Sequence, residues 1–337
     1  MLARLAAHQF WARPYVERAE DTARMVDVTY HSLLESPFVA AGPTWGQLLD
    51  VLHLRAAWEE RAVGEGGGAG GADVDAGAVV RFLVLDRANP GSIAAATARA
   101  RENVRSVREL VSSELWEAVN DLHLELAGRD LEREVAERPG EVLRLVRDEA
   151  MAIYGIASET MPRDAGWRFL ALGRLIERAE MTCRLIDVRY GQLDVLRGAR
   201  GPDVPAADGG FHHWVAVLKS ASAFEAYRRR YRASTAPADV IEFLLLADDL
   251  PRSVLYALNA SMRQLEALTD GRPSRALRLL GRTTSALAYR DVAELLDEDL
   301  HEFLEDVQAR IQQVAEAVAD EFFRHQPPGA MHAVAGG

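Results

Sequence analysis

The chain has 337 residues, of which 49% are apolar and 27% charged, and this composition excludes a disordered or collagen-like protein. It carries 39 basic and 51 acidic residues, for a net charge of −12, so we expect binding to neither nucleic acid nor an anionic membrane surface. The single cysteine, Cys183, excludes an internal disulfide and a zinc site built from several cysteines.

Helix-forming residues, and apolar residues spaced three and four apart, predict an all-α protein. In the first half we expect helices over 2–34, 44–60, 77–88, 90–111, 112–128 and 139–160. In the second half we expect helices over 163–196, 212–232, 236–248, 251–268, 273–289 and 290–324. Residues 64–77 and 198–210 are rich in glycine, proline or aspartate and are expected to be loops, and 326–337 a flexible tail.

Two segments of the chain repeat each other. Residues 17–30 and 177–190 are identical at nine of fourteen positions, with an offset of 160. A second match pairs Pro90-Gly-Ser92 with Pro251-Arg-Ser253. We therefore predict a helical bundle of two tandem repeats of about six helices each, residues 1–160 and 161–325, which share one core.

The repeated segment places charged residues along one stripe of a helix, because residues three and four apart lie on the same face. In the first copy these residues are Glu17, Glu20, Arg24 and Asp27, and in the second they are Glu177, Glu180, Arg184 and Asp187. Apolar residues flank the stripe, so these charges should be buried and paired. Arg18 and Arg178 point about 100° away from the first glutamate and are expected to reach another helix.

Three interpretations of the stripe stay open. It could be a buried ion-pair network, or a polar ligand site between the two motif helices in which arginines hold a carboxylate or phosphate. It could also be a carboxylate-bridged metal site. Histidines usually complete such metal sites, and only Glu298 and His301 have the Glu-x-x-His spacing, so we expect no metal. Cys183 lies on an apolar face and is expected to be a core residue.

Several of these residues together resemble the Alpha-E family, which is named for a helical domain with a Glu-Arg motif. The resemblance extends over essentially the whole chain. It rests on Tyr15-Val-Glu17-Arg18-Ala-Glu20, Pro90-Gly-Ser92, Ala100-Arg-Glu-Asn103, Glu114-Leu-Trp116 and Gly173-Arg174-Leu-Ile-Glu177-Arg178.

The resemblance implies an all-helical bacterial protein, encoded beside circularly permuted ATP-grasp ligases and transglutaminase-like cysteine peptidases, with some members fused to the ligase. We accordingly expect an accessory or binding protein of an ATP-dependent amide or peptide ligase, without a cofactor. The alternatives are a helical enzyme that uses the carboxylate and arginine cluster, with or without metal, and a purely structural interaction protein. No catalytic residue is implied.

The first copy departs from the family pattern at Arg13 and Pro14, where the family usually has Gly-Arg; the second copy keeps Gly173 and Arg174. Proline inside a helix removes a backbone hydrogen bond, so a kink is expected there, and a site in the first copy would be altered. The opening residues lack the apolar core of a signal peptide, and no apolar run of about 20 residues follows, so a cytoplasmic location is expected.

Overall fold

The computed structural model describes residues 3–35, 44–64, 75–200, 209–232 and 235–324. These residues form sixteen α-helices and no strand, so the predicted all-α class is confirmed. Within the described ranges, no helix combines the length and the apolar character that crossing a membrane requires.

The first half of the chain contains eight α-helices, of which the longest comes first. Their bounds are α1 Ala3–Glu35, α2 Trp45–Val51, α3 Arg55–Gly64, α4 Ala76–Val84, α5 Ile93–Ser106, α6 Ser113–Gly128, α7 Leu131–Glu137 and α8 Pro139–Thr160, with a short 3-10 turn, η1, at Arg108–Leu110. The second half again begins with its longest helix. Its elements are α9 Ala165–Arg200, α10 Gly209–Ser220, α11 Phe224–Tyr231, α12 Pro237–Leu246, α13 Val254–Thr269, α14 Arg275–Ala288, α15 Val292–Asp297 and α16 Leu300–Val318, followed by a π-helical turn, η2, at Ala319–Phe323.

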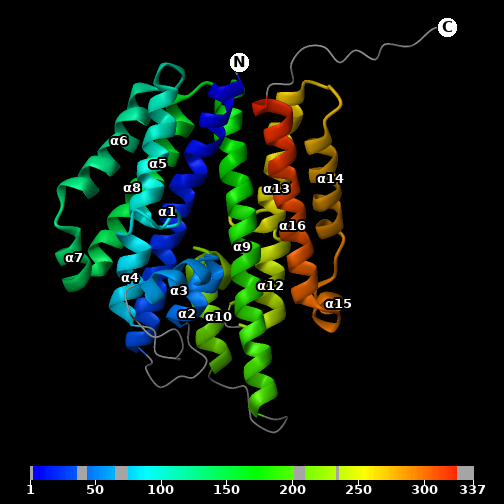
Figure 1. The fold of residues 1–337 in the computed structure, drawn as a ribbon. Coiled ribbons are helices and arrows are strands. Elements are labelled where there is room, and N and C mark those ends of the chain that lie inside the picture. Colours follow the sequence, from blue (N-terminus) through cyan, green and yellow to red (C-terminus); the bar gives the residue numbers. More distant parts are fainter. Residues whose placement is uncertain (1–2, 36–43, 65–74, 201–208, 233–234, 325–337) are drawn as a thin grey trace.

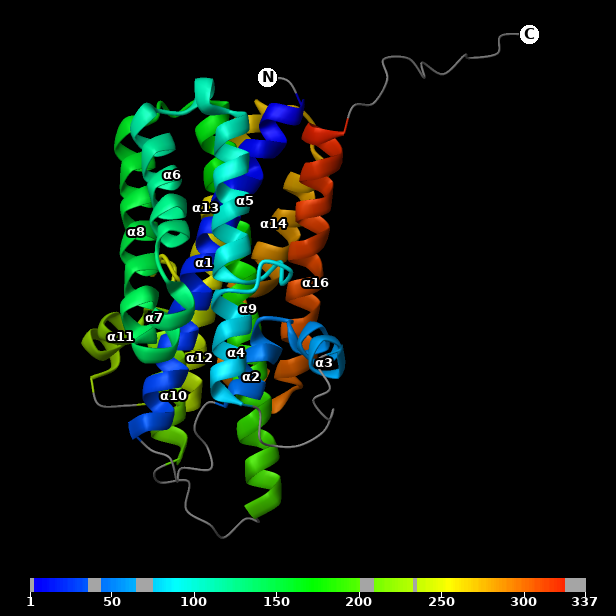
Figure 2. The ribbon, with the colours of Figure 1, turned by 60° about the vertical axis from the view of Figure 1, so that its left-hand side comes forward.

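The long helices α1 and α9 lie side by side, with further helices on either flank (Figure 1). On one flank α1, α5, α6 and α8 form a closed ring in which each helix packs against the next. On the other flank α9, α13, α14 and α16 form the same kind of ring. Figure 1 shows the two groups on opposite sides of the central pair, and the turned view shows the short helices α2–α4 gathered at one end (Figure 2).

The two flanks are joined through the interior. One cluster of buried apolar side chains extends from Ala6 in α1 to Val318 in α16. Short helices also cross between the flanks, because α2 packs against α9 and α10 packs against α1. Cys183 belongs to this core, and burial raises the pKa of its thiol, which keeps it protonated.

Each half has more helices than the six that we expected, because single predicted helices divide. The expected helix over 44–60 breaks at His53, which has a positive φ of 55°, and the one over 212–232 breaks at Ser222, with a φ of 54°. The segment 290–324 divides into α15, α16 and η2, and the helix α7 was not predicted.

Two predicted helix starts were early. Helices α5 and α13 begin at Ile93 and Val254. The hydroxyl group of the preceding serine, Ser92 or Ser253, accepts a hydrogen bond from the backbone N–H three residues further along the chain, at 3.1 Å in both helices. Serine is a favoured N-cap for this reason, and the two prolines lie in the preceding turns.

The neighbouring helices extend a few residues into both predicted loops, 64–77 and 198–210. Helix α3 ends at Gly64 and α4 begins at Ala76, whereas α9 continues to Arg200 and α10 begins at Gly209. Residues 65–74 and 201–208, and the expected tail 326–337, lie outside the described residues. Helix α1 continues without a break through Pro14.

Candidate functional site

The two motif helices, α1 and α9, approach each other closely at Gly173. A side chain at this position would overlap the backbone carbonyl oxygen of Phe10 and touch the ring of Pro14. Glycine therefore permits a helix contact that no larger residue would allow. This contact brings the Glu-Arg pairs of the two helices within reach of each other.

The two motifs exchange their arginines. Arg18 of α1 donates two hydrogen bonds to the carboxylate of Glu177 in α9, from Nε at 2.8 Å and from Nη2 at 3.0 Å. In return, Arg178 of α9 donates from Nε to Glu17 of α1 at 2.6 Å. Such charge-assisted bonds are the strong class of hydrogen bond. The motif thus ties α1 to α9 rather than closing on its own helix.

Glu17 is the most heavily bonded of these residues. Besides Arg178, it accepts from Arg174 Nε at 3.0 Å and lies 3.3 Å from Nη1 of Arg252. Its side chain has no solvent exposure. Burial by itself would raise the pKa of Glu17, but the three guanidinium groups outweigh it and hold that pKa well below the usual value. Glu17 is therefore ionised.

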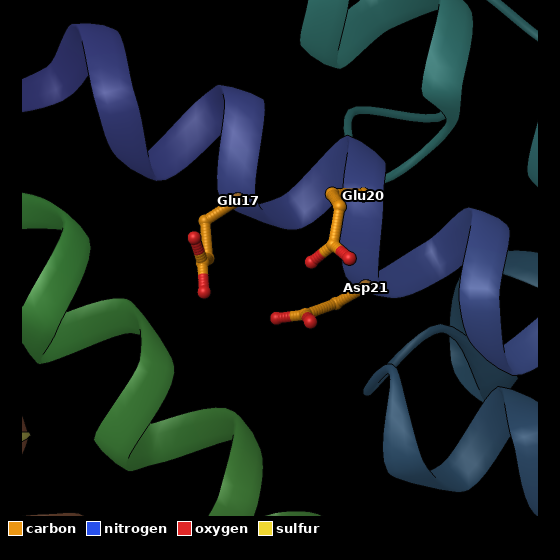
Figure 3. A group of neighbouring side chains, drawn as sticks. All are labelled: Glu17, Glu20 and Asp21. Atoms are coloured by element: carbon orange, nitrogen blue, oxygen red, sulfur yellow. The ribbon is translucent and has the colours of Figure 1, made fainter. Parts of the chain in front are cut away.

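Arg252 reaches this centre from the turn before α13. Its Nη2 donates to Glu20 at 3.0 Å and its Nη1 donates to Asp21 at 3.1 Å. Glu17, Glu20 and Asp21 point into the same space beside α9, as Figure 3 shows. Burial, and then the charge of Glu17, raise the pKa of Asp21 to about 7.

The three carboxylates could in principle hold a metal ion, because one oxygen from each lies within 4.8 Å of the others. Arg252 bonds to all three, however, so a guanidinium supplies the positive charge that a cation would bring. Glu298 and His301, the pair with metal-ligand spacing in the sequence, do not share a site. His301 bonds to Asp187, and Glu298 bonds to Arg290 at 3.2 Å.

The outer residues of the stripe make local or outward pairs. Glu20 pairs with Arg24, and Glu180 with Arg184, in the expected i, i+4 arrangement. Asp27 and Asp187 do not join the centre. Asp27 accepts from Arg147 of α8 at 2.6 Å, and Asp187 bonds to His301 of α16 at 2.6 Å.

Sequence reasoning missed three important residues: Asp21, Arg174 and Arg252. A signal was available, because Asp21 matches Met181 in the second copy and Arg252 matches Gly91 in the first. Asp21 and Arg252, two of the positions where the matched segments differ in charge, are direct partners in space. This difference makes the centre asymmetric, with the first motif deeper than the second: the Glu17 side chain is 0% exposed and that of Glu177 is 10%.

A Glu-Arg motif in a helical domain is the feature that describes one known family. The chain belongs to the Alpha-E family. The family's description is a predicted alpha-helical domain with a conserved ER motif, and its model matches residues 1–323.

The chain is also similar to two longer mycobacterial proteins. Uncharacterized proteins of Mycobacterium bovis and Mycobacterium tuberculosis are each 26% identical to the Alpha-E chain over 333 residues. The match covers 94% of this chain but 36% of each relative, so the chain spans about a third of their length. No solved structure matches the chain.

Proposed function

We propose that this Alpha-E chain is a non-catalytic accessory protein of an ATP-grasp-type amide or peptide ligase, acting in the cytoplasm. It would bind a polar ligand or a partner beside the joined motifs. A transglutaminase-like peptidase is a second partner that the family resemblance suggests.

The observation that carries this proposal is that all ten candidate residues are engaged in ion pairs. The motif charges hold α1 against α9, hold these helices to α8 and α16, or pair within one helix. A carboxylate that acts as a general base or nucleophile must reach its substrate. Glu17 and Glu20, with no exposed side-chain surface, are placed to hold the fold together instead.

We further propose that residues 1–160 and 161–325 are tandem copies of one unit. The reciprocal Arg18–Glu177 and Arg178–Glu17 pairs support this, as do the matching series of eight helices and the two four-helix rings. The much longer relatives support a unit that works together with other protein segments.

The test combines the purified chain with a circularly permuted ATP-grasp ligase of the kind that the family resemblance suggests is encoded beside it. We expect a complex in sedimentation velocity and a several-fold change in the ATP turnover of the ligase. An unrelated helical protein at the same concentration is the control. Absence of a complex, together with unchanged turnover, would overturn the proposal.

The alternative is an enzyme that uses the carboxylate cluster with a metal, and the proximity of Glu17, Glu20 and Asp21 favours it. Metal analysis of the purified protein separates the two functions. Stoichiometric metal that is lost in Glu17→Gln, while Glu177→Gln keeps it, would favour the enzyme and contradict the accessory function.

A further inference from the structure

A pocket with a volume of about 290 Å³ lies beside the joined motifs, between α1, α8, α9 and α13. This volume equals that of roughly ten water molecules in the liquid and is at the small end of the range for ligand sites. Arg13, Arg174, Arg178 and Arg263 line it. Among the described residues of its wall there is no aspartate or glutamate.

Several donors at this pocket are buried without a partner. Nε of Arg13, Nη2 of Arg178 and Nε1 of Trp167 have no hydrogen-bond acceptor within the described part of the chain. Arg13 and Arg178 are only 5% and 4% exposed. Because a buried donor without an acceptor costs free energy, these three groups indicate a missing acceptor.

Aromatic packing holds two of the guanidinium groups in place. Arg13 and Arg174 both lie over the ring of Tyr154, with distances of 5.2 Å and 3.7 Å from Cζ to the ring centroid. Cation–π contacts of this kind orient a guanidinium but do not neutralise its charge. Arg13 forms no ion pair with any described residue, and burial followed by the charge of Arg174 lowers its pKa to about 9.

The local charge balance points the same way. Away from Glu17 each charge is neutralised by one partner: Arg18 by Glu177, Arg184 by Glu180 and Arg147 by Asp27. Around Glu17 the described side chains supply three carboxylates, which are Glu17, Glu20 and Asp21. They supply five guanidinium groups, which are Arg13, Arg24, Arg174, Arg178 and Arg252. An excess of about two buried positive charges is unfavourable unless an anion enters.

We propose that this pocket binds the phosphate group of a small phosphate monoester. Arg13 and Arg178 would contact the phosphate inside the pocket, and Arg263, which is exposed on α13, would contact it at the rim. A phosphate monoester carries up to two negative charges and so matches the excess better than a single carboxylate does. Trp167 and Tyr256 supply aromatic surface for the organic part. This site does not depend on the association with a ligase.

The test uses calorimetry with phenyl phosphate, inorganic phosphate and benzoate at pH 7.5 and low salt. We expect phenyl phosphate to bind most tightly. Arg263→Gln should weaken it about tenfold, the loss of one charge-assisted hydrogen bond. Arg13→Gln should weaken it at least as much, and Arg263→Gln keeps the test valid if the buried variant does not fold. The matched control is Arg310→Gln, an arginine on α16 that pairs with Asp306 away from the pocket.

Three results would overturn the assignment. The first is no binding of phenyl phosphate, or binding that is unchanged in Arg263→Gln and, where it folds, in Arg13→Gln. The second is benzoate binding as tightly as phenyl phosphate, which would make the pocket a carboxylate site. The third is inorganic phosphate binding as tightly as the ester, which would remove the organic part from the proposal.

Discussion

The same substitution at two matched positions, Glu17→Ala and Glu177→Ala, tests how the charged centre stabilises the fold. Both residues are the glutamate of a Glu-Arg motif on a long central helix, and both bind the arginine of the other motif. Each variant loses the same atoms. Any difference in the free energy of unfolding therefore reports the surroundings of the two carboxylates.

The surroundings predict unequal losses. Removal of Glu17 leaves Arg174, Arg178 and Arg252 without their shared acceptor, and Arg178 is too deeply buried to be solvated by water. Breaking a buried ion pair from one side costs about 3–5 kcal/mol. Removal of Glu177 frees only Arg18, whose side chain is 31% exposed and can turn toward solvent. That loss should be about 1.5 kcal/mol, near the lower value for hydrogen bonds to charged groups.

The assay is urea denaturation followed by circular dichroism, with extrapolation to water at pH 7.5. We expect Glu17→Ala to lose about 1.5–3.5 kcal/mol more than Glu177→Ala, the difference between these two expected losses. Equal losses, or a larger loss for Glu177→Ala, would refute the reasoning that the first motif forms the deeper and more highly charged centre.

Two further predictions concern helix contact and pH. Gly173→Ala should destabilise the protein by about 1–3 kcal/mol in the same assay, because its Cβ would overlap the backbone of α1. Gly155→Ala, on α8 with open space around it, should instead stabilise by about 0.5–1 kcal/mol, and similar effects of both variants would contradict the close contact. The pKa of Asp21 is raised from its ordinary 3.8 to about 7, so between these values the folded state binds a proton that the unfolded state has released, and stability falls as pH rises. The stability of Asp21→Asn relative to the natural protein should therefore increase from pH 5 to pH 8, and a difference that is constant or decreases would exclude the raised pKa.

Local patterns were sufficient for much of the helical structure. The spacing of apolar residues predicted α1, α6, α8 and α9 nearly to their ends, because a helix of this length depends mainly on residues three and four apart. The same spacing predicted the Glu20–Arg24 and Glu180–Arg184 pairs. It did not predict the breaks at His53 and Ser222, where single residues adopt a left-handed conformation that their side chains do not favour.

The partners of the central charges could not be predicted in this way. A stripe of charges on a helix indicates that these charges need partners. Which residues become the partners depends on the relative orientation of the packed helices and on how closely they approach each other. Arg252 reaches Glu17 and Glu20 across more than 230 positions of sequence, from a turn that carries no sign of this role in its own local pattern. Asp27 points to α8 for the same reason, since packing decides what lies opposite each face.

The sequence by itself determined the all-helical class, the two motif helices and the requirement that their charges be buried in pairs, because each of these follows from residues close together in the chain. Only the tertiary structure decided that the two motifs exchange their arginines, and that Arg13 lies beside a pocket with no carboxylate partner among the described residues. Those outcomes depend on the contact of α1 with α9 at Gly173 and on the position of Arg252 in the turn before α13. Charge pairing over such distances in sequence is fixed by packing geometry, which no single segment contains.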